Sequence, residues 1–314
     1  MSVQHLDEAR AFLEDLAENP PWLPYEPTLI PALFAATRDD STVSIDDITA
    51  LIEQSQKLAT RVLSLANSAL YALQSTVTSL RRAVSVLGYR EVRTLVLMIG
   101  AVSTIREAKL PRGFDAKGLW RHQLRTAVIA KALADALLKG TGMPEGKPDN
   151  SLEMAPDEAY AAGLLHDIGK VFLASGRPKT WEAIETLRKR ENGDFHKAED
   201  AYWGMDHALV GAQVLHYWKL PLLLTDPINW HHAPGLAPAF AAEARLLAAA
   251  NIIAHEGVLA APGAAPANAA DAAETLPPAA AALCPEGSDP AVLGGVVAAA
   301  LRESASDTLM GLME

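Results

Sequence analysis

Helical periodicity is the feature that most constrains how this chain can fold. Apolar residues return every three or four positions through nearly all of its length, and runs of alternating β-branched residues between turns are missing from the sequence. The pattern predicts an all-α fold. Half of the 314 residues are hydrophobic, so such a chain can bury a sizeable core.

Charge and cysteine content exclude several classes of protein. The net charge of −11 argues against a large phosphate-binding face, so we expect no nucleic acid as a direct partner. The single cysteine, Cys284, cannot form an intrachain disulfide, and the first residues lack the pattern of a signal peptide. The longest uncharged apolar run in the part expected to be ordered, 94–105, is shorter than the ~20 residues that a membrane-spanning helix needs. We therefore expect a cytoplasmic protein.

Start and stop signals predict short helices in the first part of the chain. Ser44 can cap a helix, and Asp46 and Asp47 would lie in its first turn, where negative charge is favourable. Gly88 is a helix terminator, and the Pro and Gly of the stretch 110–115 mark a candidate subdomain boundary. The predicted helices of this part are 45–53, 57–67, 81–87 and 91–105.

The second part is predicted to carry helices with histidines on their inner faces. His122 and His207 each lie on an apolar stripe with a spacing of three or four residues, so both should face the core. Gly169 is expected to end the helix that carries His166 and Asp167. The predicted helices of this part are 117–138, 197–218 and 243–255.

The C-terminal part divides into two stretches of different composition. Residues 258–285 are biased toward Ala and Pro, which predicts a poorly packed connector. Helical periodicity returns in 290–312, which we expect to dock on the body of the protein.

Residues of the types that ligate metals follow one another on successive elements after the boundary at 110–115. The candidates are His122, His166, Asp167, His207, His231 and His232. A buried imidazole must be hydrogen-bonded or bound to a metal, because unpaired ring nitrogens cost roughly 1–3 kcal/mol. A single inward histidine fits a hydrogen-bonded core side chain better than a ligand, so the argument depends on the whole set. The remaining histidines, expected to be surface or structural, are His5, His196, His216 and His255.

The chemistry of this set favours a divalent transition metal. Neighbouring residues of a helix point ~100° apart, so His166 and Asp167 can converge on an ion only at a helix end. Imidazole with carboxylate suits Fe, Mn, Zn or Ni, as one ion or two, and leaves coordination positions for water or phosphate oxygens. Lys170 could hold a phosphate oxygen, or it could be an ordinary solvated lysine.

Two blocks of the sequence resemble one known family. The first block, 58–97, carries Asn67, Ser68, Tyr71 and Gly88 in a characteristic pattern of small helices. The second runs from LWRHQLRTA through GLLHDIGK to YWGMDHALVGAQVLHYWKLP and INWHH. With these blocks the chain resembles the HDOD family, the HD-related output domain of bacterial signalling proteins.

The resemblance implies an HDOD-like helical bundle in two parts. Residues 20–257 would form the HDOD domain, with an N-terminal small-helix subdomain at 20–113 packed on an HD-like helical subdomain at 114–257. The rest, 258–314, would be the connector and a C-terminal helix. Asn67 and Ser68 would cap or bridge short helices, or would form a ligand or partner surface.

The resemblance also implies two alternative functions. The candidate ligands are similar in order to those of two-metal HD-GYP phosphodiesterases, but the neutral Asn251 stands where the distal aspartate is expected and makes a weak ligand. The GYP loop after His232 is missing from the sequence. One implied function is a regulatory signalling module that binds metal and partners such as signalling proteins, a small phosphate-containing ligand or a second copy of the chain. The alternative is a metal-dependent phosphohydrolase in which Asp167 and Lys170 are catalytic.

Overall fold

The computed structural model describes residues 3–21, 28–38, 41–68, 76–260, 274–304, 309–310 and 313. These residues are mostly helical, which confirms the predicted all-α fold, and they include one short antiparallel strand pair. None of the helices described is both long enough and apolar enough to cross a membrane. The chain forms two compact units, each assembled from separate stretches: the first from 1–117, 167–225 and 307–314, the second from 118–166 and 226–306. The predicted subdomain boundaries remain predictions.

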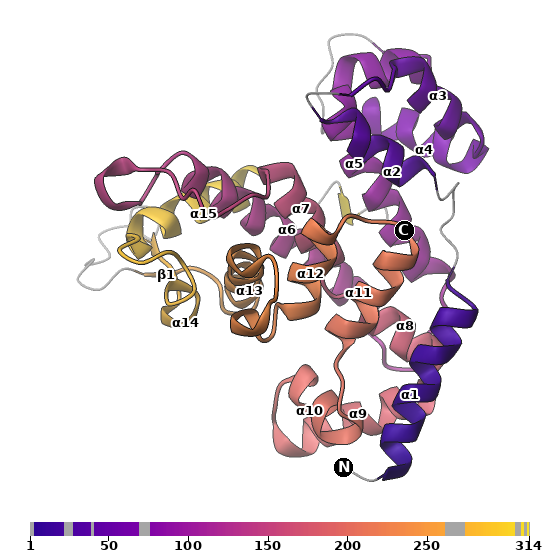
Figure 1. Cartoon of the computed structure of the whole chain (residues 1–314), viewed down its shortest axis with the longest axis vertical. Helices are drawn as coiled ribbons and strands as arrows, with labels where there is room; N and C mark the ends of the chain where they lie inside the picture. The colour runs from indigo at the N-terminus through magenta and orange to yellow at the C-terminus, as the bar shows by residue number, and fades with distance from the viewer. Residues whose placement is uncertain are drawn as a thin grey trace. The chain divides into compact units, whose positions relative to one another are not determined.

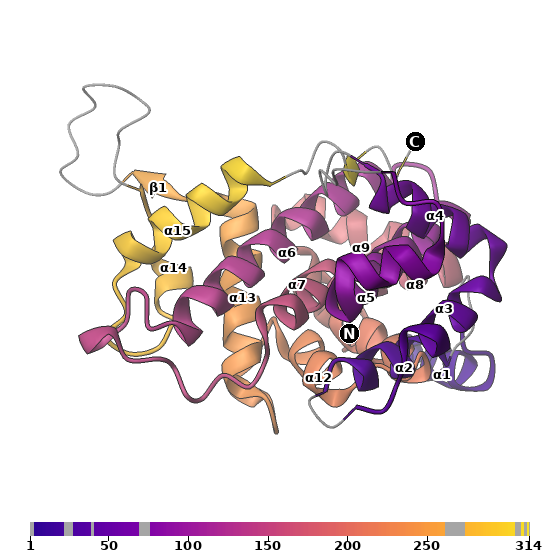
Figure 2. The same ribbon diagram turned by 90° about the horizontal axis from the view of Figure 1, so that it is seen from above.

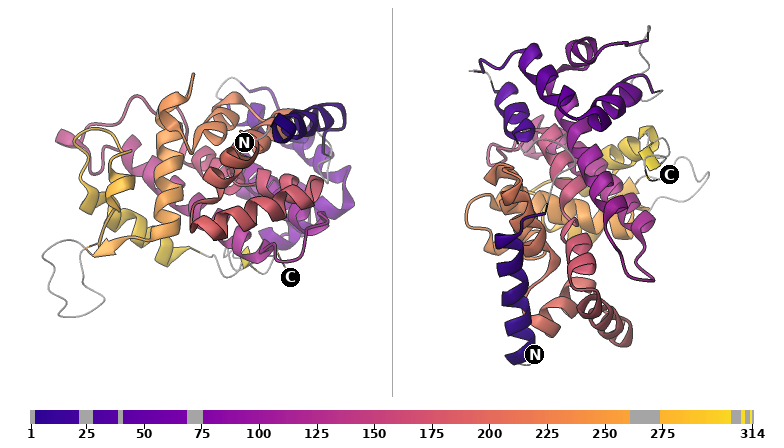
Figure 3. Two further views of the ribbon diagram at one scale, coloured as in Figure 1. Left: turned by 90° about the horizontal axis from the view of Figure 1, so that it is seen from below. Right: turned by 90° about the vertical axis from the view of Figure 1, so that its right-hand side faces the viewer.

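The N-terminal part of the first unit is a set of short helices around one long helix. Helices α2, α3 and α4 each contact α5 (Figure 1), and the right-hand view of Figure 3 shows them gathered around it. Neither α1 nor α2 was predicted. The bounds are α1 (Val3–Glu18), α2 (Leu29–Ala36), α3 (Ile45–Glu53), α4 (Gln56–Ala66) and α5 (Leu80–Glu107).

Two sequence signals in this part are confirmed. The Ser44 hydroxyl accepts a hydrogen bond from the Asp47 backbone N–H at 3.2 Å, and the Asp47 carboxylate accepts one from the Ser44 N–H at 2.8 Å. This reciprocal capping box fixes the start of α3. Gly88 interrupts α5 with φ 77° and ψ 163°, so helical geometry breaks at the predicted position.

Asn67 links two segments of the chain, as one of its two interpretations predicted. It follows the last residue of α4, and its side-chain amide donates to the carbonyls of Leu63 and Val77 at 2.9 and 2.8 Å. Its Oδ1 accepts from the Val77 N–H at 2.7 Å. Tyr71, part of the same pattern, lies outside the described residues.

The remainder of the first unit corrects the prediction of one helix over 197–218. Gly204 adopts a left-handed conformation with φ 75°, and the Asp206 carboxylate caps a new helix by accepting from the Leu209 N–H at 3.1 Å. Apolar periodicity continues through this break, which hid it from the sequence. The bounds, of which α8 and α9 were not predicted, are α8 (Gly169–Gly176), α9 (Pro178–Glu191), α10 (Phe195–Trp203) and α11 (His207–Tyr217).

Gly169 does not end a helix as predicted; it begins α8. A Cβ at this position would lie 1.9 Å from the His207 backbone oxygen and 2.6 Å from the Gly211 nitrogen. Only glycine allows the backbones of α8 and α11 to approach so closely. The preceding turn, at 166–168, separates α7 from α8 and is where His166 and Asp167 lie.

The longest helices of the second unit are α6 and α13. Helix α13 contacts α7 and α14, which Figure 2 labels, and α15 contacts β2. Helix α6 confirms the predicted helix 117–138, and α13 confirms 243–255 within two residues at its start and one at its end. The bounds are α6 (Ala116–Leu138), η1 (Pro144–Gly146), α7 (Pro156–Leu165), α12 (Leu222–Trp230, which starts in the first unit), η2 (Pro234–Leu236), α13 (Ala241–Glu256), β1 (Leu259–Ala260), β2 (Glu274–Thr275), α14 (Pro278–Ala281) and α15 (Pro290–Glu303).

The predicted connector is better packed than its composition suggested. Strands β1 and β2 pair antiparallel, and Leu276 and Ala280 are buried. The central part of the connector, 261–273, lies outside the described residues. The C-terminal helix docks as predicted, because α15 contacts β2 and buries Leu293 and Val297, but it covers only Pro290–Glu303 of the predicted stretch 290–312.

Candidate metal centre

The predicted site residues fall into two groups, each held within one unit. The imidazole group, in the second unit, contains His122, His166, His231, His232 and, unpredicted, His255. The carboxylate group, in the first unit, contains Asp167, Lys170, His207 and, unpredicted, Glu199. His166 and Asp167 are consecutive residues, so one peptide bond joins the two groups.

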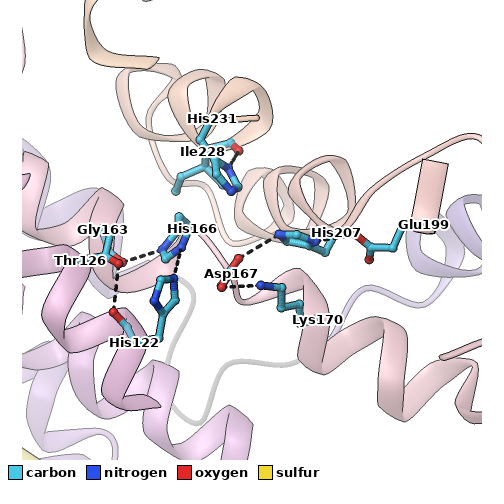
Figure 4. A network of polar contacts seen from close by, with 10 residues as sticks. All are labelled: His122, Thr126, Gly163, His166, Asp167, Lys170, Glu199, His207, Ile228 and His231. Carbon is cyan, nitrogen blue, oxygen red and sulfur yellow. Dashed lines mark hydrogen bonds and ion pairs between the residues drawn. The ribbon is translucent and has the colours of Figure 1, made fainter. Parts of the chain in front are cut away.

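Close packing of two helices brings His122 and His166 together. Gly163 of α7 faces α6 so closely that a Cβ there would lie 2.7 Å from the Ala127 Cα. His122 is part of α6, and His166 directly follows α7. Their Nε2 atoms lie 3.2 Å apart (Figure 4). The Thr126 hydroxyl donates to the His122 carbonyl at 2.9 Å, one turn along the same helix.

Backbone carbonyls fix the proton positions of two rings. Nδ1 of His166 lies 2.8 Å from the Gly163 carbonyl, and Nδ1 of His231 lies 2.7 Å from the Ile228 carbonyl (Figure 4). A carbonyl oxygen can only accept, so Nδ1 must carry the hydrogen in both rings. In a neutral ring this places the lone pair on Nε2, which is the form in which histidine binds metals.

The other rings of the imidazole group extend this cluster. The ring centroids of His166 and His231 lie 5.1 Å apart, and those of His231 and His232 lie 3.9 Å apart. His255 of α13 stacks on His122 with centroids 4.2 Å apart. His255 is exposed, as expected of a surface residue, and its contact with His122 was not predicted.

Asn251 occupies a buried position on α13. Its side chain is 8% exposed, and its Oδ1 has no hydrogen-bond partner in the described part of the chain. An amide oxygen is a weaker metal ligand than a carboxylate, so its predicted role as a weak ligand remains a prediction.

Asp167 is the centre of the carboxylate group. Its Oδ1 lies 2.8 Å from Nε2 of His207, and its Oδ2 accepts a hydrogen bond from the Lys170 ammonium at 2.6 Å (Figure 4). Asp167 is 1% exposed and Lys170 is 20% exposed. The lysine is therefore held by an ion pair rather than solvated, and it retains some access to solvent.

Glu199 is the partner of His207 that sequence reasoning missed. Its Oε2 lies 2.6 Å from Nδ1 of His207, and both side chains are fully buried. Burial alone would lower the pKa of His207, but the negative charges of Glu199 and Asp167 outweigh it and raise that pKa to about 9. Burial also raises the pKa of Glu199. Each ring nitrogen of His207 thus faces a carboxylate oxygen, an arrangement that favours the protonated ring.

The geometry of the imidazole group fits a divalent metal. Two nitrogens that each bind an ion at about 2.0–2.1 Å are roughly 2.9–3.4 Å apart, depending on coordination geometry. The separation of 3.2 Å between Nε2 of His122 and Nε2 of His166 falls in this range. The neighbouring donor types, imidazole and carboxylate, are those that Fe, Mn, Zn and Ni accept.

Comparisons with known proteins agree with this fold. A family model described as the HDOD domain matches residues 23–234. The chain is 29% identical over 200 residues to an uncharacterized protein of Treponema pallidum, a match that covers 64% of this chain but only 36% of that protein.

Two solved structures resemble the chain over nearly its whole length. An HDOD domain protein of unknown function from Geobacter sulfurreducens is 26% identical, with 98% of both chains covered and a TM-score of 0.67. A Shewanella amazonensis protein named as a candidate phosphohydrolase is 24% identical, with 97% of this chain and 98% of that chain covered and a TM-score of 0.65. The second likeness shows the fold alone.

Proposed function

The chain belongs to the HDOD family, and on that premise we propose that it is a regulatory signalling module of bacteria that binds a divalent transition metal. One observation carries the metal-binding part of the proposal. Nε2 of His122 lies 3.2 Å from Nε2 of His166, whose Nδ1 is held by a backbone carbonyl. These two ring nitrogens are therefore at the spacing of two ligands on one ion.

The ion would be held first by His122, His166 and the carboxylate of the adjoining Asp167. His207, His231 and His232 are further proposed ligands, of the same ion or a second one, and Asn251 is a weak one. When bound, such an ion lowers the pKa of coordinated water and can polarise a phosphate oxygen. The partners we propose are signalling proteins, a second copy of the chain or a small phosphate-containing ligand.

A second candidate function is a metal-dependent phosphohydrolase. The ion pair between Lys170 and Asp167 favours it, because it holds a cation beside the candidate ligand where it could contact a phosphate oxygen. The name of the Shewanella protein points to the same class of reaction. Against it stand the neutral Asn251 and the few basic residues close in sequence to the candidate ligands, chiefly Lys170, Arg121 and Arg125.

Metal content tests the main proposal. We expect purified protein to carry Fe, Mn, Zn or Ni by elemental analysis, and the double variant His166→Ala with Asp167→Ala to lose most of it. The matched control is His216→Ala with Asp200→Ala, which removes an exposed histidine and an exposed aspartate. Unmutated protein that holds no metal, even after growth with these metals, would reject the proposal.

Turnover separates the two candidate functions. If the protein is a phosphohydrolase, protein loaded with Mn or Fe should hydrolyse some phosphate ester or cyclic nucleotide. Asp167→Asn should abolish this activity while circular dichroism shows an intact fold. Metal-loaded protein that turns over nothing in a broad screen would favour the regulatory module.

A further inference from the structure

The fully buried Glu199 has no place in the candidate ligand set. Its Oε2 lies 2.6 Å from Nδ1 of His207, whose Nε2 lies 2.8 Å from Oδ1 of Asp167. Asp167 in turn accepts from Lys170 at 2.6 Å. Four polar side chains from α8, α10, α11 and the turn before α8 thus form one continuous row, with Glu199 at its inner end.

Stability does not explain this carboxylate. Removing a carboxylate from water costs several kcal/mol, and apolar residues of similar size can usually replace a buried ion pair without loss. The Oε1 atom of Glu199 also has no hydrogen-bond partner within the described residues, which adds to the cost. What the carboxylate does supply is a fixed acceptor for one ring nitrogen of His207.

The break between α10 and α11 makes the contact possible. In a continuous helix, residues eight positions apart are separated by ~12 Å along the axis. The left-handed Gly204 ends α10 and the Asp206 cap starts α11, and across this break Glu199 contacts His207. Phe195 and Trp203 flank Glu199 on the same face of α10. The ring centroid of Phe195 lies 6.2 Å from that of His207 and 5.9 Å from Nζ of Lys170.

We propose that Glu199 is a positioning residue that holds Nδ1–H of His207 and thereby turns Nε2 of that ring toward Asp167. A carboxylate in this role fixes the ring orientation of a metal-binding histidine and strengthens the ring as a ligand. The orientation follows from the contacts within the first unit. Its consequence for metal affinity rests on the function proposed above.

Nuclear magnetic resonance of metal-stripped protein tests the orientation. The Nδ1–H proton of His207 should give a downfield resonance that exchanges slowly with water, and His207→Gln assigns it by its loss. Glu199→Gln keeps the size and an acceptor oxygen, so the resonance should remain with a smaller downfield shift. Glu199→Met has a similar volume but no acceptor, and the resonance should disappear.

Cobalt(II) affinity tests the consequence for the metal. We expect Glu199→Met to weaken Co²⁺ binding about 10- to 100-fold, and Glu199→Gln to weaken it less. Asp200→Asn is the matched control, because this neighbouring carboxylate is exposed and should leave both readouts unchanged. If Glu199 positions His207, Glu199→Gln should bind Co²⁺ more tightly than Glu199→Met. If Glu199 only fills space, the two variants should have the same Co²⁺ affinity.

The outcomes separate this inference from the proposed function. A His207 resonance that persists in Glu199→Met, or a Co²⁺ affinity of that variant equal to that of Asp200→Asn, would overturn the positioning role. Unmutated protein that binds no Co²⁺ but shows the expected resonances would support the positioning role and reject the metal proposal. If Glu199→Met does not fold, an unchanged resonance in Glu199→Gln overturns the role and a reduced shift supports it.

Discussion

The sequence was sufficient to predict which residue types form the site, but not which of these residues contact one another. The candidate ligands were found because histidines and an aspartate follow one another on successive elements, and the structure places His122 beside His166, and Asp167 beside His207. Glu199 was missed because a glutamate in a polar stretch looks like a surface residue. Its place between Phe195 and Trp203, at a spacing of four, is the signal that it faces inward.

Cys284 gives a prediction at the residue scale. Burial raises the pKa of its thiol to about 11, from an ordinary value of 9.0. Because only the thiolate reacts, alkylation by iodoacetamide at pH 8 should be about 100-fold slower in the folded protein than in urea-unfolded protein. Mass spectrometry follows the reaction, and Cys284→Ser should incorporate no label. Equal rates in the two states would contradict the assignment.

The raised pKa of the same thiol predicts how its contribution to the free energy of unfolding changes with pH. The unfolded thiol ionises near pH 9, whereas the folded thiol stays protonated until about pH 11. The contribution of Cys284 to the free energy of unfolding is thus complete below pH 9 and falls as the pH rises toward 11. Cys284→Ser should remove this part of the pH dependence.

At the scale of elements, local signals predicted several helix ends. The features that depend on contacts between distant residues could not be predicted in this way. Ser44 and Gly88 act locally, so their effects could be read from sequence. The break at Gly204 was missed because apolar spacing continues across it. Gly169 was assigned to the wrong role because its reason lies in α11, some forty residues away.

Gly169 gives a prediction about how α8 packs on α11. Gly169→Ala would place a methyl group 1.9 Å from the His207 backbone oxygen, so the two helices would have to separate. We expect the free energy of unfolding to fall by about 3 kcal/mol, at the upper end for overpacking. Urea denaturation measures the loss.

A matched glycine controls this experiment. A Cβ at Gly193 meets nothing within 4 Å, so Gly193→Ala should change the free energy of unfolding by less than about 0.5 kcal/mol. Equal stability of the two variants would show that α8 and α11 are not in the described contact.

For the whole molecule, helical periodicity was sufficient to predict an all-α fold but not how the chain divides into two compact units. Helical spacing predicts an all-α protein wherever the helices lie. The two compact units are each assembled from distant stretches, and one ends at His166 where the other resumes at Asp167. No local pattern encodes that division, because it depends on which helices contact one another.

Metal removal gives a prediction for the whole molecule. A ligand that binds only the folded state at 100 times its dissociation constant adds about 2.7 kcal/mol to the free energy of unfolding. On the proposed function, chelation should lower the Tm by roughly 5–10 °C. Scanning calorimetry with and without EDTA measures this shift. The variant His166→Ala with Asp167→Ala should show none, and an unchanged Tm in metal-loaded unmutated protein would contradict the proposal.

The short link Gly204–Asp206 has a consequence for how the protein could change. Inserting one residue into α10 between Glu199 and Trp203 would rotate the preceding part of the helix by ~100°. Phe195 and Glu199 would then leave the interior together, while Trp203 stayed in place. A change of one residue in the length of α10 would therefore remove Glu199 and Phe195 from His207 at the same time.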